Sequence, residues 1–190
     1  MKKQIIIIIS ILVSAFALYS ADVVVYPRTT GTPYPCPIPK TGQTNSYAAE
    51  DDGALQKGIA WPVTRFTVQA NTNCVLDNLT GLMWARNSSN AAAAAAWGTA
   101  VTNCNNLNYG GYTDWRLPNV RELFSLIDFA ILVPSLPVGH PFSLVGARWY
   151  WTSTGAAWAT TAAWSMYING DVTADDKAVV LYVWPVRGGY

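Results

Sequence analysis

Hydrophobic and polar positions in the last third of the chain follow the pattern of β-strands. Residues 148–153, 163–168, 171–173 and 178–186 are rich in β-branched and aromatic side chains. The dipeptide Asn169-Gly170 lies between two of these segments and is a pair that tight hairpin turns favour. We therefore predict that this part of the chain folds into an antiparallel sheet.

The middle of the chain carries instead the spacing of three and four residues that is typical of amphipathic helices. After a polar cluster at residues 87–90, a run of alanines opens the segment 91–107, whose apolar side chains recur at this spacing. A second helix is predicted from Asn119 to Phe129, because Asn119 and Glu122 form the sequence signature of a capping box. Early helices and late strands together predict an α+β fold with two helices packed on a mostly antiparallel sheet. Shorter strands are predicted at residues 65–68, 74–77 and 82–84.

Charged residues are concentrated just before the second helix, around Trp115. Only 12% of the residues in the chain are charged, yet four of them lie between residues 114 and 122. We expect Asp114, Arg116 and Arg187 to form an ion pair that locks the Trp115 strand against the C-terminal strand. The functional alternative is an arginine that binds a carboxylate ligand.

The N-terminal residues have the layout of a secretory signal peptide. Lys2 and Lys3 precede an apolar run, residues 5–18, that is too short to span a bilayer comfortably. We predict a signal peptide over residues 1–21, with an uncleaved anchor as the alternative. The mature chain is expected to contain no membrane span.

Residues 22–39 are predicted to form an extended, Pro-rich arm. Five prolines fall within this segment, and prolines at that density remove backbone donors and favour an extended chain. The valines at positions 23–25 have the character of a strand that can pair with a sheet edge in the same chain or in another copy. The remaining residues, 40–190, are enough for one domain with a full core.

Composition argues against a nucleic-acid-binding protein. The 190-residue chain has 12 basic and 11 acidic residues, and removal of Lys2 and Lys3 leaves 10 against 11, a net charge of −1. Nine tryptophans and ten tyrosines exceed what a core of this size usually holds, so we expect some of them at the surface.

No catalytic or metal-binding pattern is recognisable, so we expect a protein that is not an enzyme and needs no cofactor. His140 is the sole histidine, and no histidine or cysteine accompanies it at the spacing of metal ligands. Residues 50–53 contain three acidic side chains, but they lack the spacing of an EF-hand loop, which favours a solvated acidic turn over a cation site.

Four motifs, in order along the chain, resemble one bacterial family, that of the C-terminal domain of the Legionella collagen-like adhesin. The resemblance spans roughly residues 39–190 and implies a secreted or surface-displayed domain in which Trp84, Trp115 and the capped helix are structural. Arg116-Leu117-Pro118 followed by a capped helix is also similar to the sulfatase-modifying factor branch of the C-type-lectin-like fold. That branch's oxidase activity is not carried over, because no cysteine matches its catalytic positions, and the Glu-Pro-Asn and Trp-Asn-Asp triplets of calcium-binding lectins are missing. The motifs are residues 77–84, residues 111–119 with Glu122-Leu123, residues 150–154, and residues 183–189.

Cys36, Cys74 and Cys104 are an odd number of cysteines for an exported chain. Cys74 and Cys104 flank two of the motifs that must pack together, so we expect them to form a disulfide, with fully reduced thiols as the alternative. Cys36 would then be free, capped or bonded to another chain.

The expected function is adhesion or recognition through the loops of this scaffold. Trp158, set among small residues, is predicted to be an aromatic side chain at a loop tip. Together with Asp171, Asp175, Asp176 and Lys177 on facing turns, it forms our candidate site for an extracellular glycan or a surface protein, since an aromatic ring suits the apolar face of a sugar and carboxylates suit its hydroxyls. The alternative for these four polar residues is an ordinary solvated turn. A second functional hypothesis is a structural subunit that self-associates into an extracellular filament through residues 22–39.

Overall fold

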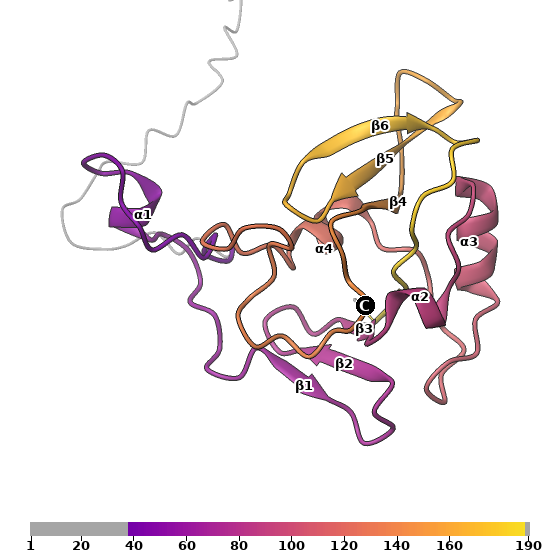
Figure 1. Cartoon of the computed structure of the whole chain (residues 1–190), viewed down its shortest axis with the longest axis horizontal. Coiled ribbons are helices and arrows are strands. Elements are labelled where there is room, and N and C mark those ends of the chain that lie inside the picture. Colours follow the sequence, from indigo (N-terminus) through magenta and orange to yellow (C-terminus); the bar gives the residue numbers. More distant parts are fainter. Residues whose placement is uncertain (1–37, 189–190) are drawn as a thin grey trace, which may run out of the picture. The chain divides into compact units, whose positions relative to one another are not determined.

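The computed structural model of the chain describes residues 38–188, which belong to one compact unit (Figure 1). The predicted signal peptide, Cys36 and all but the last two residues of the predicted arm lie outside these residues. Within the described part, no helix is long and apolar enough to cross a membrane.

The strands of the described residues form two antiparallel sheets, whereas one sheet was predicted. The predicted α+β class is confirmed, although strands outweigh helices. The first sheet has the order β1-β2-β3-β7, and the second has the order β4-β5-β6. The strands are β1 (Phe66–Val68), β2 (Cys74–Asp77), β3 (Met83–Ala85), β4 (Trp149–Gly155), β5 (Ala162–Tyr167), β6 (Val172–Asp176) and β7 (Val186–Arg187).

The predicted hairpin at Asn169-Gly170 is confirmed and joins β5 to β6. Gly170 has a φ of +97°, a backbone conformation that side chains disfavour, and the N–H of Tyr167 donates to the carbonyl of Asp171 at 2.8 Å to close the turn. The turn fixes the register, in which Met166 lies opposite Val172.

The predicted strand 178–186 is wrong over most of its length. Only Val186 belongs to a strand, β7, and that strand pairs with β3 in the first sheet. Upstream of it, Leu181 pairs with Ala95 and Tyr182 with Tyr150 as isolated bridges. This segment therefore crosses from one sheet to the other. Val183 and Val186 are buried along it, whereas Val179 and Val180 are exposed, so its β-branched residues do not mark one continuous strand.

The predicted helix 91–107 is also wrong in its first half. The helix that forms there is α3 (Trp97–Asn105), after the single turn α2 (Ser88–Ala91), and residues 92–96 between them are not helical. The carbonyl of Ala95 accepts bonds from the Leu181 N–H at 3.2 Å and the Trp151 Nε1 at 2.9 Å. In a helix this carbonyl would accept a hydrogen bond from an N–H of the same helix. Because Leu181 and Trp151 bind it instead, residues 92–96 are not helical, despite the high helix propensity of alanine.

The second predicted helix is present but shorter, as α4 (Val120–Phe124). Its capping box forms as expected: the Asn119 side chain accepts from the Glu122 N–H at 2.9 Å, and the Glu122 carboxylate accepts from the Asn119 N–H at 2.8 Å. The helix lies beside β4 and β5 (Figure 1), where the Val120 N–H donates to the hydroxyl of Thr154 at 3.2 Å.

Two buried clusters of apolar side chains hold these elements together. The larger contains Trp84, Trp115 and Trp184, and the rings of Trp84 and Trp184 meet edge to face with centroids 5.6 Å apart. The smaller packs α3 against the second sheet around Trp151 and Leu117. All four tryptophans are fully buried, whereas the other five of the nine are half-buried or exposed, so only part of the aromatic surplus serves the core.

The structure does not contain the predicted Cys74–Cys104 disulfide, because both thiols are free and each belongs to a different cluster. Cys74 packs in the larger one, beside Gly110, and Cys104 packs on α3 in the smaller one. Burial raises the pKa of both thiols, that of Cys104 to about 12. Each cysteine is therefore an apolar core residue, as buried cysteines often are.

Candidate functional site

The residues predicted to bind a ligand lie at both ends of the β5–β6 hairpin and so do not form a single site. Asp175 and Asp176 pair with Ala163 and Ala162, close to the loop that carries Trp158. Asp171 lies at the opposite end, in the Asn169-Gly170 turn.

The polar members of this set are engaged in local contacts. Asp175 accepts a hydrogen bond from the hydroxyl of Ser165, and Asp176 accepts one from the N–H of Ala178 at 2.8 Å. Lys177 donates from Nζ to the carbonyl of Thr160 at 2.7 Å. Its ammonium also lies 4.5 Å from the centre of the Trp97 ring. These contacts give the polar side chains a role in the hairpin and its neighbouring loop.

Trp158 is the large apolar member of the set, and it is open to solvent, as are Asp171 and Asp176. Its side chain is 69% exposed, and its ring meets Trp164 of β5 edge to face with centroids 5.1 Å apart. The loop beneath it is closed by the N–H of Ala156, which donates to the carbonyl of Ala162 at 3.1 Å. An ordered aromatic side chain is thus displayed at the end of the second sheet.

Asp114 and Arg187 form a bidentate pair that joins the Trp115 segment to β7. The two bonds measure 2.6 and 3.0 Å, and the guanidinium lies 3.9 Å from the centre of the Tyr112 ring. The Arg187 guanidinium lowers the pKa of Asp114, and Asp114 raises the pKa of Arg187. Because the pair is partly exposed, its contribution to the free energy of unfolding is small, about 1 kcal/mol or less.

Arg116 makes a separate pair with Glu122, so the expected three-residue cluster forms as two pairs. Both bonds of this fork measure 2.7 Å, and Arg116 also donates to the carbonyl of Gly188 at 2.8 Å. The backbone groups of Arg116 and Val186 exchange two hydrogen bonds. Between the two pairs, Trp115 is 2% exposed and donates from Nε1 to the carbonyl of Tyr109 at 3.0 Å.

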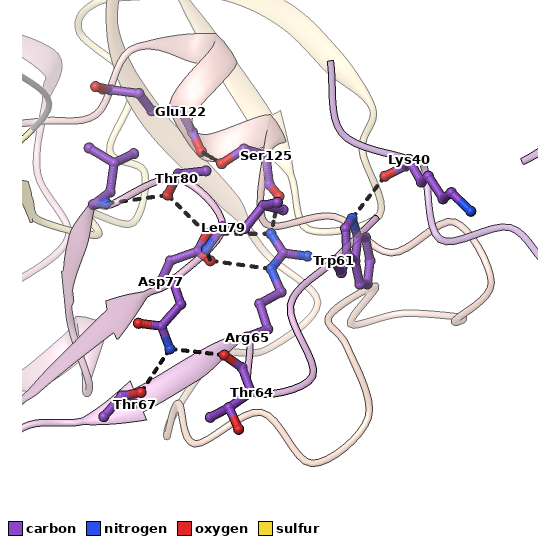
Figure 2. Close-up of polar contacts among 12 residues, drawn as sticks. Lys40, Trp61, Thr64, Arg65, Thr67, Asp77, Leu79, Thr80, Glu122 and Ser125 are labelled. Atoms are coloured by element: carbon purple, nitrogen blue, oxygen red, sulfur yellow. Dashed lines mark hydrogen bonds and ion pairs between the residues drawn. The ribbon is translucent and has the colours of Figure 1, made fainter. Parts of the chain in front are cut away.

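A buried ion pair between Arg65 and Asp77 was not anticipated from the sequence (Figure 2). The side chains are 6% and 0% exposed, and Arg65 also donates to the carbonyl of Ser125 at the end of α4. Asp77 additionally accepts from the N–H of Leu79 and the hydroxyl of Thr80, both at 3.0 Å. The pair therefore ties the turn after β2 to α4. Asp77 was visible in the motif at residues 77–84, but nothing in the sequence marked Arg65 as its partner.

Trp61 covers the guanidinium of Arg65. The ring centre lies 4.3 Å from the guanidinium carbon, and Trp61 Nε1 donates to the carbonyl of Lys40 at 2.9 Å. Burial lowers the pKa of Arg65, while the charges of Asp77 and Asp128 oppose that shift. Nη1 of Arg65 is buried without a hydrogen-bond partner among the described residues, and Figure 2 shows this third nitrogen on the side of Trp61.

The acidic turn at residues 50–53 is occupied by its own backbone. Asp51 caps α1 (Asp52–Leu55) by accepting from the N–H of Ala54, and it also accepts from the N–H groups of Tyr47 and Ala48 in the preceding turn. These bonds lower the pKa of its carboxyl. Over residues 38–188, no group of three or more histidine, cysteine, aspartate or glutamate side chains is arranged to hold a metal ion.

A comparison with protein-family models identifies the family of this chain. The family model described as the Lcl C-terminal domain matches residues 73–187, and no curated protein matches the chain. The matched range runs from β2 to β7 and includes the Asp114–Arg187 pair, the capped helix α4 and the Trp158 loop, whereas Trp61 and Arg65 precede it. Because the match covers 115 of the 190 residues, the chain belongs to the family of the C-terminal domain of the Legionella collagen-like protein, Lcl.

Proposed function

We propose that this protein is a secreted or surface-displayed, non-enzymatic bacterial domain that recognises an extracellular glycan or a surface protein. Family membership supports the coarser part of the proposal, because it relates the chain to bacterial surface and adhesin-related domains. The export-type N-terminus supports secretion, and the lack of a recognisable catalytic motif in the sequence supports a binding role.

The observation that carries the proposal is the exposed, ordered ring of Trp158. Large aromatic side chains at a surface supply much of the binding energy in recognition sites, and a ring that is already ordered loses little entropy on binding. Trp164 supports one edge of the ring, and the Lys177 contact with Thr160 holds the same loop. The apolar faces of sugar rings and flat protein surfaces both suit such a side chain.

A glycan array tests this function directly. We expect the purified protein to bind at least one class of glycan and the Trp158→Ala variant to lose that binding. Tyr47→Ala is the matched control, because Tyr47 is an exposed aromatic residue, at 82%, on a different segment. Absence of binding to every glycan and to surface proteins of target cells would contradict the proposal.

The alternative is a structural subunit that self-associates through residues 22–39. Of that segment, the structure describes Ile38 and Pro39, which line an apolar groove of about 670 Å³ together with Phe124 and Phe129. Sedimentation of the purified protein with and without residues 22–37 tests this alternative. A concentration-dependent assembly that the deletion abolishes would support it, and a monomer in both cases would reject it.

The C-type-lectin-like arrangement is also part of the proposal. Its support is the Arg116-Leu117-Pro118 segment followed by the capped helix α4 and the pairing of the C-terminal strand β7 with β3. An experimental structure with a strand order other than that of the C-type-lectin-like fold would contradict this part of the proposal.

A further inference from the structure

A second cavity, separate from the Trp158 loop, lies between the first described segment and the end of α4. Its volume is about 340 Å³, at the lower end of the range of about 300–1,000 Å³ that small-molecule sites occupy. It therefore suits a single ring with its substituents. The residues that matter for its chemistry are Lys40, Gly42, Gln43, Gln56, Trp61 and Asp128.

Trp61 provides a fixed aromatic wall for this cavity. Its Nε1 is bonded to the carbonyl of Lys40, and the guanidinium of Arg65 packs against its ring (Figure 2). These two contacts hold the indole in place in the absence of any ligand. A preorganised aromatic wall is suited to the C–H face of a saturated ring.

Asp128 provides a buried acceptor at the same cavity. Its side chain is 8% exposed, and Oδ1 accepts from the N–H of Ala130 at 2.9 Å. No hydrogen bond to Oδ2 is present within residues 38–188, which leaves one carboxylate oxygen to accept from a ligand. A ligand hydroxyl group that donates to this oxygen would gain a charge-assisted hydrogen bond, which is stronger than one between neutral groups.

Gly42 allows these two side chains to lie close to the backbone. Its φ is +91°, and a Cβ at this position would meet the carboxylate of Asp128 and lie 2.9 Å from the Trp61 ring. Any larger residue would therefore push into the cavity or displace its walls.

The charges around the cavity balance one another. Asp77 neutralises Arg65, and Lys40 and Asp128 contribute one charge of each sign to the lining. Gln43 and Gln56 each use their side-chain N–H₂ on a backbone carbonyl, at 3.0 and 3.3 Å, and so offer amide oxygens as neutral acceptors. Because these two charges cancel, the lining has no net attraction for a charged ligand, and the carboxylate and amide oxygens suit a neutral ligand with hydroxyl groups.

From this lining we infer that the cavity binds one neutral sugar ring, with its C–H face on Trp61 and a hydroxyl donating to Oδ2 of Asp128. The inference stands apart from recognition at Trp158, because the two sites share no residue. It gives the chain a second contact with carbohydrate, at a cavity whose walls come from residues 40–61, which precede the family match, and from Asp128, which lies within it.

Nuclear magnetic resonance titration of the purified, ¹⁵N-labelled protein tests the inference. The probes are D-glucose, D-galactose, D-mannose and N-acetyl-D-glucosamine at millimolar concentrations, and the reporters are the indole N–H of Trp61 and the backbone N–H of Ala130. We expect saturable shifts of both reporters with at least one probe. Asp128→Asn should weaken that binding by about tenfold or more, since it removes the charge from a hydrogen bond to the ligand.

Further variants keep the test decisive. Gly42→Ala should abolish binding by filling the cavity. Gln43→Ala is a milder substitution that should also weaken binding, and it replaces Asp128→Asn or Gly42→Ala in the test if either of those proteins does not fold. Trp158→Ala and Asp171→Asn are controls that should leave the affinity within about twofold, because neither residue lines the cavity. Loss of glycan-array binding in Trp158→Ala with intact shifts at Trp61 would separate this site from the proposed function.

Three results would overturn the inference. One is no shift of either reporter with any of the four sugars up to 100 mM in folded protein. The second is binding that survives both Gly42→Ala and Gln43→Ala. The third is saturable binding of choline chloride or sodium sulfate at these reporters in preference to every neutral sugar, since it would assign the cavity to a charged ligand.

Discussion

The buried pair between Arg65 and Asp77 makes a quantitative prediction about stability. Asp77→Asn keeps the shape of the side chain but removes the ion-pair partner of the Arg65 guanidinium, which is 6% exposed, and leaves only the charge of Asp128 acting on it. Removal of one partner from a buried pair costs about 3–5 kcal/mol, whereas the whole free energy of unfolding of a domain is about 5–15 kcal/mol. We therefore expect Asp77→Asn to lower the melting temperature by roughly 6–20 °C, at about 2–4 °C per kcal/mol for a domain of this size.

Urea unfolding followed by tryptophan fluorescence measures the loss in the free energy of unfolding. Asp114→Asn is the matched control, because it breaks the partly exposed pair with Arg187 and should cost about 1 kcal/mol or less. In the Arg65→Met, Asp77→Asn double variant neither member of the pair is left without the other, so its free energy of unfolding should exceed that of Asp77→Asn alone. The reasoning is refuted if Asp77→Asn costs no more than Asp114→Asn, or if Arg65→Met restores nothing.

Three further predictions concern other parts of the fold. Cys74 and Cys104 should react with a thiol reagent only after unfolding, because both are buried with raised pKa values; rapid labelling of either in native protein would contradict their placement. Burial lowers the pKa of His140, so the folded state binds fewer protons than the unfolded state, and the free energy of unfolding should fall as pH drops through and below about 6.5. The urea midpoint of His140→Gln should therefore change less between pH 7.5 and 5 than that of the wild type. Equal pH dependence in the two proteins would rule this out. Asn119→Ala should lower the free energy of unfolding by about 0.5–2 kcal/mol through loss of the capping box, and an unchanged urea midpoint would argue against that cap.

Local signals in the sequence were sufficient for the features that depend on a few adjacent residues. The Asn169-Gly170 turn and the Asn119–Glu122 capping box each need only neighbours in the chain, and both form as predicted. The class of the fold followed from the same patterns, because the period of the apolar residues separates helices from strands.

Features that depend on distant partners were missed. The alanines at 92–96 are good helix formers, but the carbonyl of Ala95 is bonded to Trp151 and Leu181, far away in the sequence. The expected disulfide was wrong for a related reason, since the two thiols pack in different clusters that the spacing of cysteines does not reveal.

The candidate site was only partly predictable. The isolation of Trp158 among small residues predicted its exposure, whereas the place of Asp175 and Asp176 near the Trp158 loop, away from Asp171 in the turn, depends on the register of β5 and β6. The cavity beside Trp61 and Asp128 is assembled from residues more than 60 positions apart, and neither residue carries a local signal of its role.

Recognition through the exposed ring of Trp158 is the central property proposed for this protein, and an affinity measurement tests it most directly. Isothermal titration of the purified protein with its best glycan from the array should give a Kd that rises about thirtyfold in Trp158→Ala, the loss expected for an aromatic anchor worth about 2 kcal/mol. Tyr47→Ala should leave the Kd within about twofold. Equal affinities for wild type and Trp158→Ala would contradict the account.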